Sequence, residues 1–349
     1  MHRMRSRAFR PLMAGAAAIF AIGLMAGCSS DAGESADGGN AGTTTEENAA
    51  TGETVTIGWS GPEADHGWLG AINTGAINAA ESFGDVELVQ AEGTNDVNQQ
   101  IAAIEKFIND GVDAIVLLPS DGAALTQAAQ KAMDAGIPVI NVDREFSSTF
   151  ASRVTVLGDN YGMGVSAGTY ICEELDGQAD AVVAEIAGID SLPLTQDRSQ
   201  GFKDALEGCG LEVGPRVAAD FTVAGGESAT SQLLSANPKI DAIWNHDDDQ
   251  GVGVMAAIES AGRSEFFMVG GAGSVNMMDR IKEDDSVMKA TVIYPSTQAA
   301  DGIALARLIA QGKTLGDIIT PSVPFRIVLD APVVTKDNVD EFIDLAFES

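Results

Sequence analysis

The amino-acid sequence predicts an α/β fold made of two similar lobes, each a doubly wound parallel sheet. Three observations predict it. Short β-rich runs alternate with helix-length amphipathic segments from residue 55 onward, and this rhythm restarts after residue 158. The folded body is also close to 300 residues long, a size at which single hydrophobic cores tend to split into two domains.

Residues 1–27 are expected to be a lipoprotein signal peptide and not part of the fold. A basic start with four arginines precedes an apolar stretch over residues 12–26, shorter than the roughly 20 apolar residues that a membrane span needs. The following motif, LMAGC, resembles a bacterial lipoprotein box, which implies that Cys28 is lipidated. A plain secretory signal and an uncut anchor are the alternatives.

Residues 28–52 are expected to be a disordered tether. The segment is polar, has no apolar period and offers nothing to bury. A flexible chain of this length has an end-to-end distance of roughly 25–30 Å. The tether would therefore hold the folded body just above a membrane surface.

Strands and helices alternate along the first half of the folded body. Amphipathic spacing predicts helices over residues 70–83, 99–111 and 123–135. Apolar, β-rich runs between them predict buried parallel strands, in the segments TVTIGWS, VELVQA, DAIVLLP and PVINVD.

The second half repeats this pattern. Helices are predicted over residues 163–175, 199–207, 228–236 and 251–261, alternating with AVVAEIA, RVAADF, DAIWNH and FFMVGGA as strands. The duplication is explicit in VDAIVLLPSD from residue 112 and IDAIWNHDDD from residue 240. Thirty residues after each Asp-Ala-Ile aspartate comes a further strand end, at Asp143 and Gly271.

Polar side chains gather where these strands end. Because parallel α/β sheets bind ligands at the carboxyl ends of their strands, two facing lobes would share one cleft there. Carboxylates, arginines, amides and aromatic rings follow the strands, with almost no aliphatic lining. Carboxylates accept hydrogen bonds from paired hydroxyls, arginine donates to oxygens, and an aromatic face packs on the C–H side of a sugar ring. This mixture favours a polyol ligand.

The composition argues against several classes of function. The formal net charge is −31, with acids spread along the chain, so nucleic acid is not an expected partner. No P-loop or nucleophile elbow is present, and GGAGSV lacks the third glycine of a dinucleotide loop. We expect no enzyme activity, cofactor or metal, although Asp65, His66, His246 and Asp247 could in principle converge on a divalent ion.

Six segments, in order along nearly the whole body, carry a family resemblance. They are VTIGWS, GVDAIVLLPSD, AGIPVINVDR, DRSQGF, AIWNHDDDQGVG and ATVIYPSTQ. They resemble the ribose/galactose-type sugar-binding proteins of ABC importers. The resemblance implies a monomeric Venus flytrap with three hinge crossings that closes over a monosaccharide or similar polyol. We accordingly expect residues 53–157 and 299–325 to form the first lobe and residues 158–298 and 326–349 the second.

The same resemblance implies which side chains contact the ligand in the first lobe. The loop after the first strand falls on Ser60, His66 and Trp68, with Trp68 in the place of a sugar-stacking aromatic. The family's Asp-Arg pair falls on Asp143 and Arg144. Each also has a simpler structural interpretation: a core tryptophan, capping residues or a surface ion pair.

In the second lobe, the resemblance implies contacts from Arg198, Phe221 and Asp247, and from Gln298 on the hinge side. Ala272 stands where many members of the family have a hydroxyl-binding aspartate. Asp247 or Asp65 would compensate for that missing carboxylate.

Cys172 and Cys209 both fall in the expected second lobe. An exported protein can keep a disulfide, but the sequence alone leaves open whether these cysteines are bridged or are two buried small residues.

The expected function is an extracytoplasmic solute-binding protein, lipid-anchored at the outer face of the bacterial cell membrane or periplasmic, that delivers a sugar or polyol to an ABC permease. The alternative is an extracellular sensor that presents its liganded form to a membrane signalling receptor.

Overall fold

The computed structural model describes residues 43–316 and 322–349. The expected signal peptide and the lipidation site at Cys28 lie outside the described residues. Within them, no helix combines the length and the apolar character that a membrane crossing requires.

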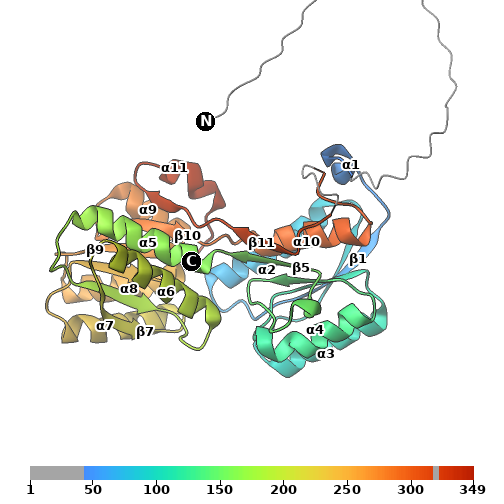
Figure 1. Ribbon diagram of the computed structural model, residues 1–349, viewed down its shortest axis with the longest axis horizontal. Coiled ribbons are helices and arrows are strands. Elements are labelled where there is room, and N and C mark those ends of the chain that lie inside the picture. Colours follow the sequence, from blue (N-terminus) through green and yellow to red (C-terminus); the bar gives the residue numbers. More distant parts are fainter. Residues whose placement is uncertain (1–42, 317–321) are drawn as a thin grey trace, which may run out of the picture. The chain divides into compact units, whose positions relative to one another are not determined.

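The first sheet has six strands in the order β11-β5-β4-β3-β1-β2, all parallel. Helices α2 and α10 pack together on one face, and α3 and α4 lie side by side on the other (Figure 1). The elements of this lobe are β1 Val55–Ser60, α2 Gly67–Ser82, β2 Val86–Gln90, α3 Val97–Asp110, β3 Ala114–Leu117, α4 Gly122–Asp134, β4 Val139–Val142, η1 Thr149–Ala151, β5 Val154–Gly158, α10 Gln298–Ala310 and β11 Arg326–Leu329.

The second sheet has the order β12-β10-β9-β8-β6-β7, in which only the pairing of β12 with β10 is antiparallel among the described strands. Helix α5 packs against α6, and α7 against α8 (Figure 1). Its elements are α5 Asn160–Leu175, β6 Val183–Ala187, α6 Pro193–Gly208, β7 Val213–Ala218, α7 Val223–Ala236, β8 Ala242–Asn245, α8 Asp248–Ala261, β9 Phe267–Ala272, α9 Val275–Glu283, β10 Met288–Ile293, β12 Val333–Thr335, α11 Val339–Phe342 and η2 Ile343–Leu345.

The predicted fold class and internal duplication are confirmed. The repeated segments form β3 and β8, which occupy the same central place in their sheets, and β4 and β9 follow them. Every residue of β3 and β8 is buried, as expected for parallel strands covered by helices on both faces. Gly111 and Gly262 end α3 and α8 in the left-handed conformation, at φ of 70° and 64°, which glycine adopts without strain.

The helices begin earlier than their apolar periodicity predicts. Helix α2 begins at Gly67 instead of residue 70, α6 at Pro193 instead of 199, α7 at Val223 instead of 228, and α8 at Asp248 instead of 251. In α6, α7 and α8 most of the added first-turn residues are polar or small, so they add little to the apolar pattern from which a helix is predicted. In α2 the added residues include Trp68 and Leu69, which are apolar and buried.

Within residues 43–316 and 322–349, the chain passes between the two sheets three times: between β5 and β6, between β10 and α10, and between β11 and β12. The expected lobe boundary after residue 325 is corrected, because β11 pairs in parallel with β5 and extends the first sheet.

The expected tether is also shorter than predicted. Helix α1 (Thr45–Ala49) begins with a capping box between Thr44 and Glu47. Arg307 on α10 donates to the backbone oxygens of Asn48 and Ala50, at 2.7 and 2.8 Å. These contacts order residues 43–52 against the first lobe.

Cys172 and Cys209 form a disulfide with an S–S distance of 2.09 Å and a Cα–Cα distance of 6.2 Å. It joins α5 to the end of α6 within the second lobe. Of the two alternatives that the sequence left open, the structure contains the bridge.

Candidate functional site

Side chains from the carboxyl ends of both sheets enclose one small cavity. Its volume is about 30 Å³, and most of the residues predicted as ligand contacts line it. The lining residues are His66, Trp68, Asp143, Arg144, Leu194, Arg198, Phe221, Asp247 and Tyr294.

Two aromatic rings form the inner wall. The rings of Trp68 and Tyr294 lie 5.5 Å apart, and the indole N–H of Trp68 donates to the carbonyl of Tyr294 at 3.2 Å. The Tyr294 hydroxyl donates to Asp143 and accepts from the amide of Asn160 at 3.0 Å. Burial, with the Asp143 carboxylate beside it, raises the pKa of Tyr294, so the phenol remains a hydrogen-bond donor.

Asp143 and Arg144 supply the first lobe's charged groups. Asp143 follows β4, has a φ of 62° and is 4% exposed, so its carboxylate is held rigidly at the strand end. The Nη1 atom of Arg144 donates at 3.2 Å to the carbonyls of both Pro119 and Ser120. Its Nε atom is buried without a hydrogen-bond partner among the described residues.

Arg198 holds the second lobe's side of the cavity. Its guanidinium lies 4.4 Å from the centre of the Tyr294 ring and 5.9 Å from that of Phe221. Its Nε donates to Asn160 Oδ1 at 2.9 Å, and Nη1 donates to the carbonyl of His246 at 3.1 Å. These contacts leave the guanidinium little freedom.

Three consecutive acidic residues, 247–249, lie at the start of α8, and each makes different contacts. Asp247 lines the cavity and caps the helix through the Gln250 N–H, and burial beside Asp249 raises its pKa. Asp248 is fully buried and faces away, accepting hydrogen bonds from the loop after β9. Asp249 accepts from the backbone N–H of Trp68 at 2.9 Å, which joins the two lobes.

A buried polar layer lies beneath these groups. The imidazole of His246 is 2.9 Å from the carboxylate of Glu185, which also accepts from Arg216 at 3.2 Å. Burial lowers the pKa of His246. The layer fixes the strand ends on which Arg198 and Asp247 depend.

Three predicted contacts do not reach the cavity wall. Ser60 is buried at the end of β1, and Asp65 is exposed and paired with the His66 imidazole at 2.6 Å. Gln298 is buried at the start of α10, where its amide donates to Pro295. The distance from Nε2 of Gln298 to the carbonyl oxygen of Pro295 is 3.0 Å. The side chain therefore stabilises the turn at the hinge.

Leu194, Asn160 and Tyr294 were not among the ligand contacts predicted from the sequence. Asn160 and Leu194 lie in the first turns of α5 and α6, where no apolar periodicity marks the helix. Tyr294 directly follows β10, and this place at a strand end is the feature of the sequence that could have predicted its position at the cavity.

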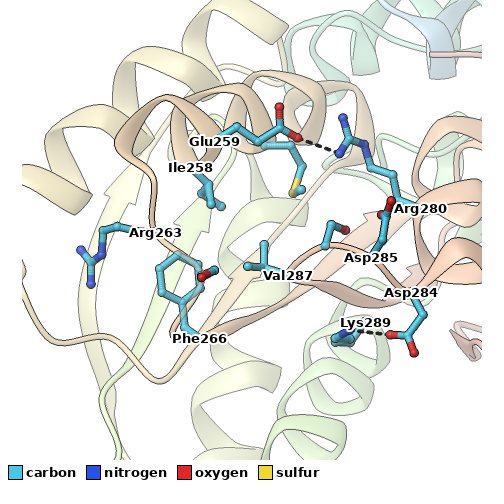
Figure 2. Close-up of a pocket in the computed structure, with 12 residues that line it drawn as sticks. Ile258, Glu259, Arg263, Phe266, Arg280, Asp284, Asp285, Val287 and Lys289 are labelled. Atoms are coloured by element: carbon cyan, nitrogen blue, oxygen red, sulfur yellow. Dashed lines mark hydrogen bonds and ion pairs between the residues drawn. The ribbon is translucent and has the colours of Figure 1, made fainter.

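A larger cavity of about 500 Å³ adjoins the small one and shares Asp143, Arg144 and Leu194 with it. A separate hollow of about 600 Å³ lies at the amino ends of strands β9 and β10 of the second sheet, around Val287 and Phe266 (Figure 2). Its charged residues pair with one another, as Figure 2 shows for Glu259 with Arg280. This hollow is far from the strand ends that carry the predicted contacts.

No group of three or more histidine, cysteine or acidic side chains with a metal-binding arrangement occurs in the described parts of the chain. His66 lies at the cavity, whereas His246 faces Glu185 in the layer beneath it.

Comparisons with known proteins identify the family and the fold. Residues 57–314 match the family model for a periplasmic binding protein domain. The D-apiose import binding protein of Actinobacillus succinogenes is 30% identical over 257 residues, 72% of this chain and 81% of the relative. The ribose import binding protein of Bacillus subtilis is 28% identical over 263 residues, 73% of this chain and 84% of the relative.

Solved structures share the fold. A protein of Mycobacterium smegmatis in complex with β-D-fucofuranose is 25% identical, with a TM-score of 0.74 over 83% of this chain and 94% of that one. The match to the family model covers most of the chain, and the two lobes reproduce the family's fold. The chain therefore belongs to the periplasmic binding protein domain family.

Proposed function

We propose that this protein captures a monosaccharide or similar polyol between its lobes and delivers it to an ABC permease. The supporting observation is that one cavity wall combines aromatic faces, carboxylates and fixed guanidinium groups drawn from both lobes. The relatives are binding proteins of import systems by name, which favours delivery over the sensor alternative and over catalysis.

Ligand contacts to both lobes would make closure depend on the ligand. A cavity of about 30 Å³ has room for water but not for a sugar, since ligand pockets usually measure roughly 300–1,000 Å³. The Tyr294 hydroxyl already donates a hydrogen bond to the Asp143 carboxylate, which is the acceptor that a sugar hydroxyl would use. Binding would therefore separate the Tyr294–Asp143 contact and re-close the lobes over the ligand.

A thermal-shift screen of residues 29–349 against pentoses, hexoses, inositols, sugar alcohols and nucleosides tests the proposal. A ligand at 100 times its dissociation constant stabilises the folded state by about 2.7 kcal/mol. We expect stabilisation by one stereochemical series. No response to any sugar or polyol would contradict the proposal.

Variants at the cavity identify the site. Trp68→Ala and Asp143→Ala should each weaken binding about 100-fold by calorimetry, because each removes a group whose place is fixed by the fold. Asp180→Ala is the control, since that carboxylate is exposed and lies outside the cavity, and it should retain affinity within about threefold. Full affinity in both cavity variants would place the ligand elsewhere.

Membrane attachment through Cys28 is part of the same proposal. Replacing Cys28 by serine removes the thiol that would carry the lipid. We expect the wild-type protein in the membrane fraction of the producing cells and the variant in the soluble extracytoplasmic fraction. Membrane association of both would exclude lipid at Cys28 as the anchor.

A further inference from the structure

The cavity of about 500 Å³ beside the proposed sugar site differs from it in chemistry. Residues 120–123 and 143–147 line it from the first lobe, and residues 191–194 from the second. It shares Asp143, Arg144 and Leu194 with the small cavity, so the two cavities adjoin. Its volume lies in the range of sites that enclose ligands larger than one sugar ring.

Much of this second wall is apolar. Leu192, Pro193 and Leu194 are the apolar residues of the second-lobe side, which Asn160, Ser191 and Asp197 complete, and Phe146 and Leu157 also line the cavity. A sugar hydroxyl placed against these side chains would lose its hydrogen bonds to water and gain none. The wall instead matches an apolar ring, whose removal from water is favourable.

Hydrogen-bonding groups without partners mark the junction of the two cavities. Arg144 Nε and Ser120 Oγ are buried and have no hydrogen-bond partner among the described residues, although Nε lies 3.8 Å from the Asp143 carboxylate, in an ion pair. Arg144 lines both cavities, and its Nη1 atom is held by the Pro119 and Ser120 carbonyls. A donor is thus presented where the oxygen joining a sugar to its substituent would lie.

The charges around the second cavity exclude an anionic substituent. Asp121, Glu145 and Asp197 line it together with the single arginine. Asp121 caps α4 through the Ala124 N–H at 2.9 Å, and Glu145 pairs with Arg326 at 2.9 Å. Burial and the nearby Glu145 raise the pKa of Asp197, which reflects the acidic character of this wall. A phosphate or carboxylate on the ligand would be repelled.

We infer that the cavity is a subsite for the substituent of a glycoside, so that the ligand is a monosaccharide bearing an uncharged, apolar group at its anomeric oxygen. The inference rests on the proposed function, which supplies the sugar half of the ligand.

Matched pairs of probes test it by calorimetry on residues 29–349: D-ribose with phenyl β-D-ribofuranoside, D-galactose with phenyl β-D-galactopyranoside, and D-glucose with phenyl β-D-glucopyranoside. In the pair whose sugar binds, the substituted probe should bind about tenfold more tightly, because its ring is buried against the apolar wall. The corresponding sugar phosphate should not bind.

Leu192→Ser removes part of the apolar wall without weakening the fold. Leu192 is the N-cap of α6 and makes no capping hydrogen bond, whereas serine is a preferred N-cap residue. The variant should lose about fivefold in affinity for the substituted probe and none for the free sugar. Ile189→Ser, an exposed apolar-to-serine change nearby that lies outside the cavity, should change neither affinity.

Each outcome is decisive. Equal affinities within a pair, binding of the free sugar alone, or an unchanged preference in Leu192→Ser would overturn the subsite while leaving the proposed function intact. Failure of both members of every pair, together with failure of the broader sugar screen, would overturn both. Tighter binding of the substituted probe that Leu192→Ser abolishes would support it.

Discussion

The two lobes share one sheet order, yet the segments that follow their equivalent strands β3 and β8 are built differently. After β3, the chain continues with Leu118-Pro119-Ser120-Asp121, and the last of these is exposed. After β8 it continues with His246-Asp247-Asp248-Asp249-Gln250, and all five are buried. The same backbone architecture thus tolerates either an ordinary strand-to-helix turn or a buried run of ionisable groups.

The difference shows what burying such groups demands. Each buried acid of the second lobe has hydrogen-bond donors: Asp247 the N–H of Gln250, Asp249 that of Trp68, and Asp248 the N–H groups of Gly271, Gly273 and Ser274. Without them the cost of desolvation would be prohibitive. The second lobe is therefore a pre-organised polar frame, and the first lobe offers Trp68 and Asp143 from a more apolar scaffold.

The largest expected effect comes from comparing Asp248→Ala with Ser120→Ala, the equivalent position in the first lobe. This comparison tests the contrast between the two lobes. Asp248 accepts three backbone N–H bonds and the Thr291 hydroxyl, so its truncation should lower the free energy of unfolding by about 4 kcal/mol. Ser120 Oγ lacks a hydrogen-bond partner among the described residues, so its loss should cost less than about 0.5 kcal/mol. Urea denaturation measures both, and equal losses would remove the contrast.

The disulfide gives the second lobe a further constraint. Opening the bridge between Cys172 and Cys209 by the double serine variant should lower the free energy of unfolding by about 3 kcal/mol, because it closes a loop with a sequence separation of 37. Reducing agent should destabilise the wild type to the same extent and leave the double variant unaffected. Denaturation that reductant does not shift would refute a stabilising role.

The first lobe has its own buried ion pair, far from the cleft. Asp85 and Arg307 are both nearly inaccessible, and the guanidinium of Arg307 lowers the pKa of the Asp85 carboxyl. A carboxyl whose pKa falls on folding stabilises the protein above its unfolded pKa of about 3.9, and that stability is lost as the pH falls further.

Asp85→Asn should therefore cost about 2 kcal/mol at pH 7, with the difference from wild type shrinking below about pH 4. Asp65→Asn, which changes an exposed carboxylate, is the control and should cost less than about 0.5 kcal/mol. Denaturation across pH 7 to 3 checks the trend, and a pH-independent difference would show that the charge of Asp85 is not the cause.

The smallest effect concerns the aromatic wall of the second lobe. Whereas Trp68 is held by hydrogen bonds, Phe221 packs over Gly188, where an added Cβ would lie 1.9 Å from the ring. Gly188→Ala should displace the ring and weaken ligand binding about tenfold. In Gly208→Ala the new methyl group meets nothing within 4 Å, so affinity should not change. Unaltered binding in both would show that Phe221 does not shape the site.

The sequence predicted more of the scaffold than of the site. The alternation of buried strands and amphipathic helices, and the repeated Asp-Ala-Ile segments, were enough for the two lobes, because burial imposes a period on apolar residues. Trp68, Asp143, Arg144, Arg198, Phe221 and Asp247 were placed at strand ends by the same logic.

The site residues that were missed lie in segments without a periodic pattern of apolar residues. The first turns of α5 and α6 carry Asn160 and Leu194, and neither residue belongs to an apolar stripe that ends at the strand. Gln298 was expected in the cleft but donates a hydrogen bond to Pro295, because it begins α10 after the turn that follows Tyr294, the residue that does reach the cavity.

The sequence by itself determined the alternation of strands and helices within each lobe, because the burial pattern of strands and helices is local. Only the tertiary structure decided that β11 returns to the first sheet, that Cys172 meets Cys209, and that Asp249 of one lobe caps the Trp68 N–H of the other. Those contacts join residues far apart in the chain, and their geometry depends on how whole elements pack, which no local pattern records.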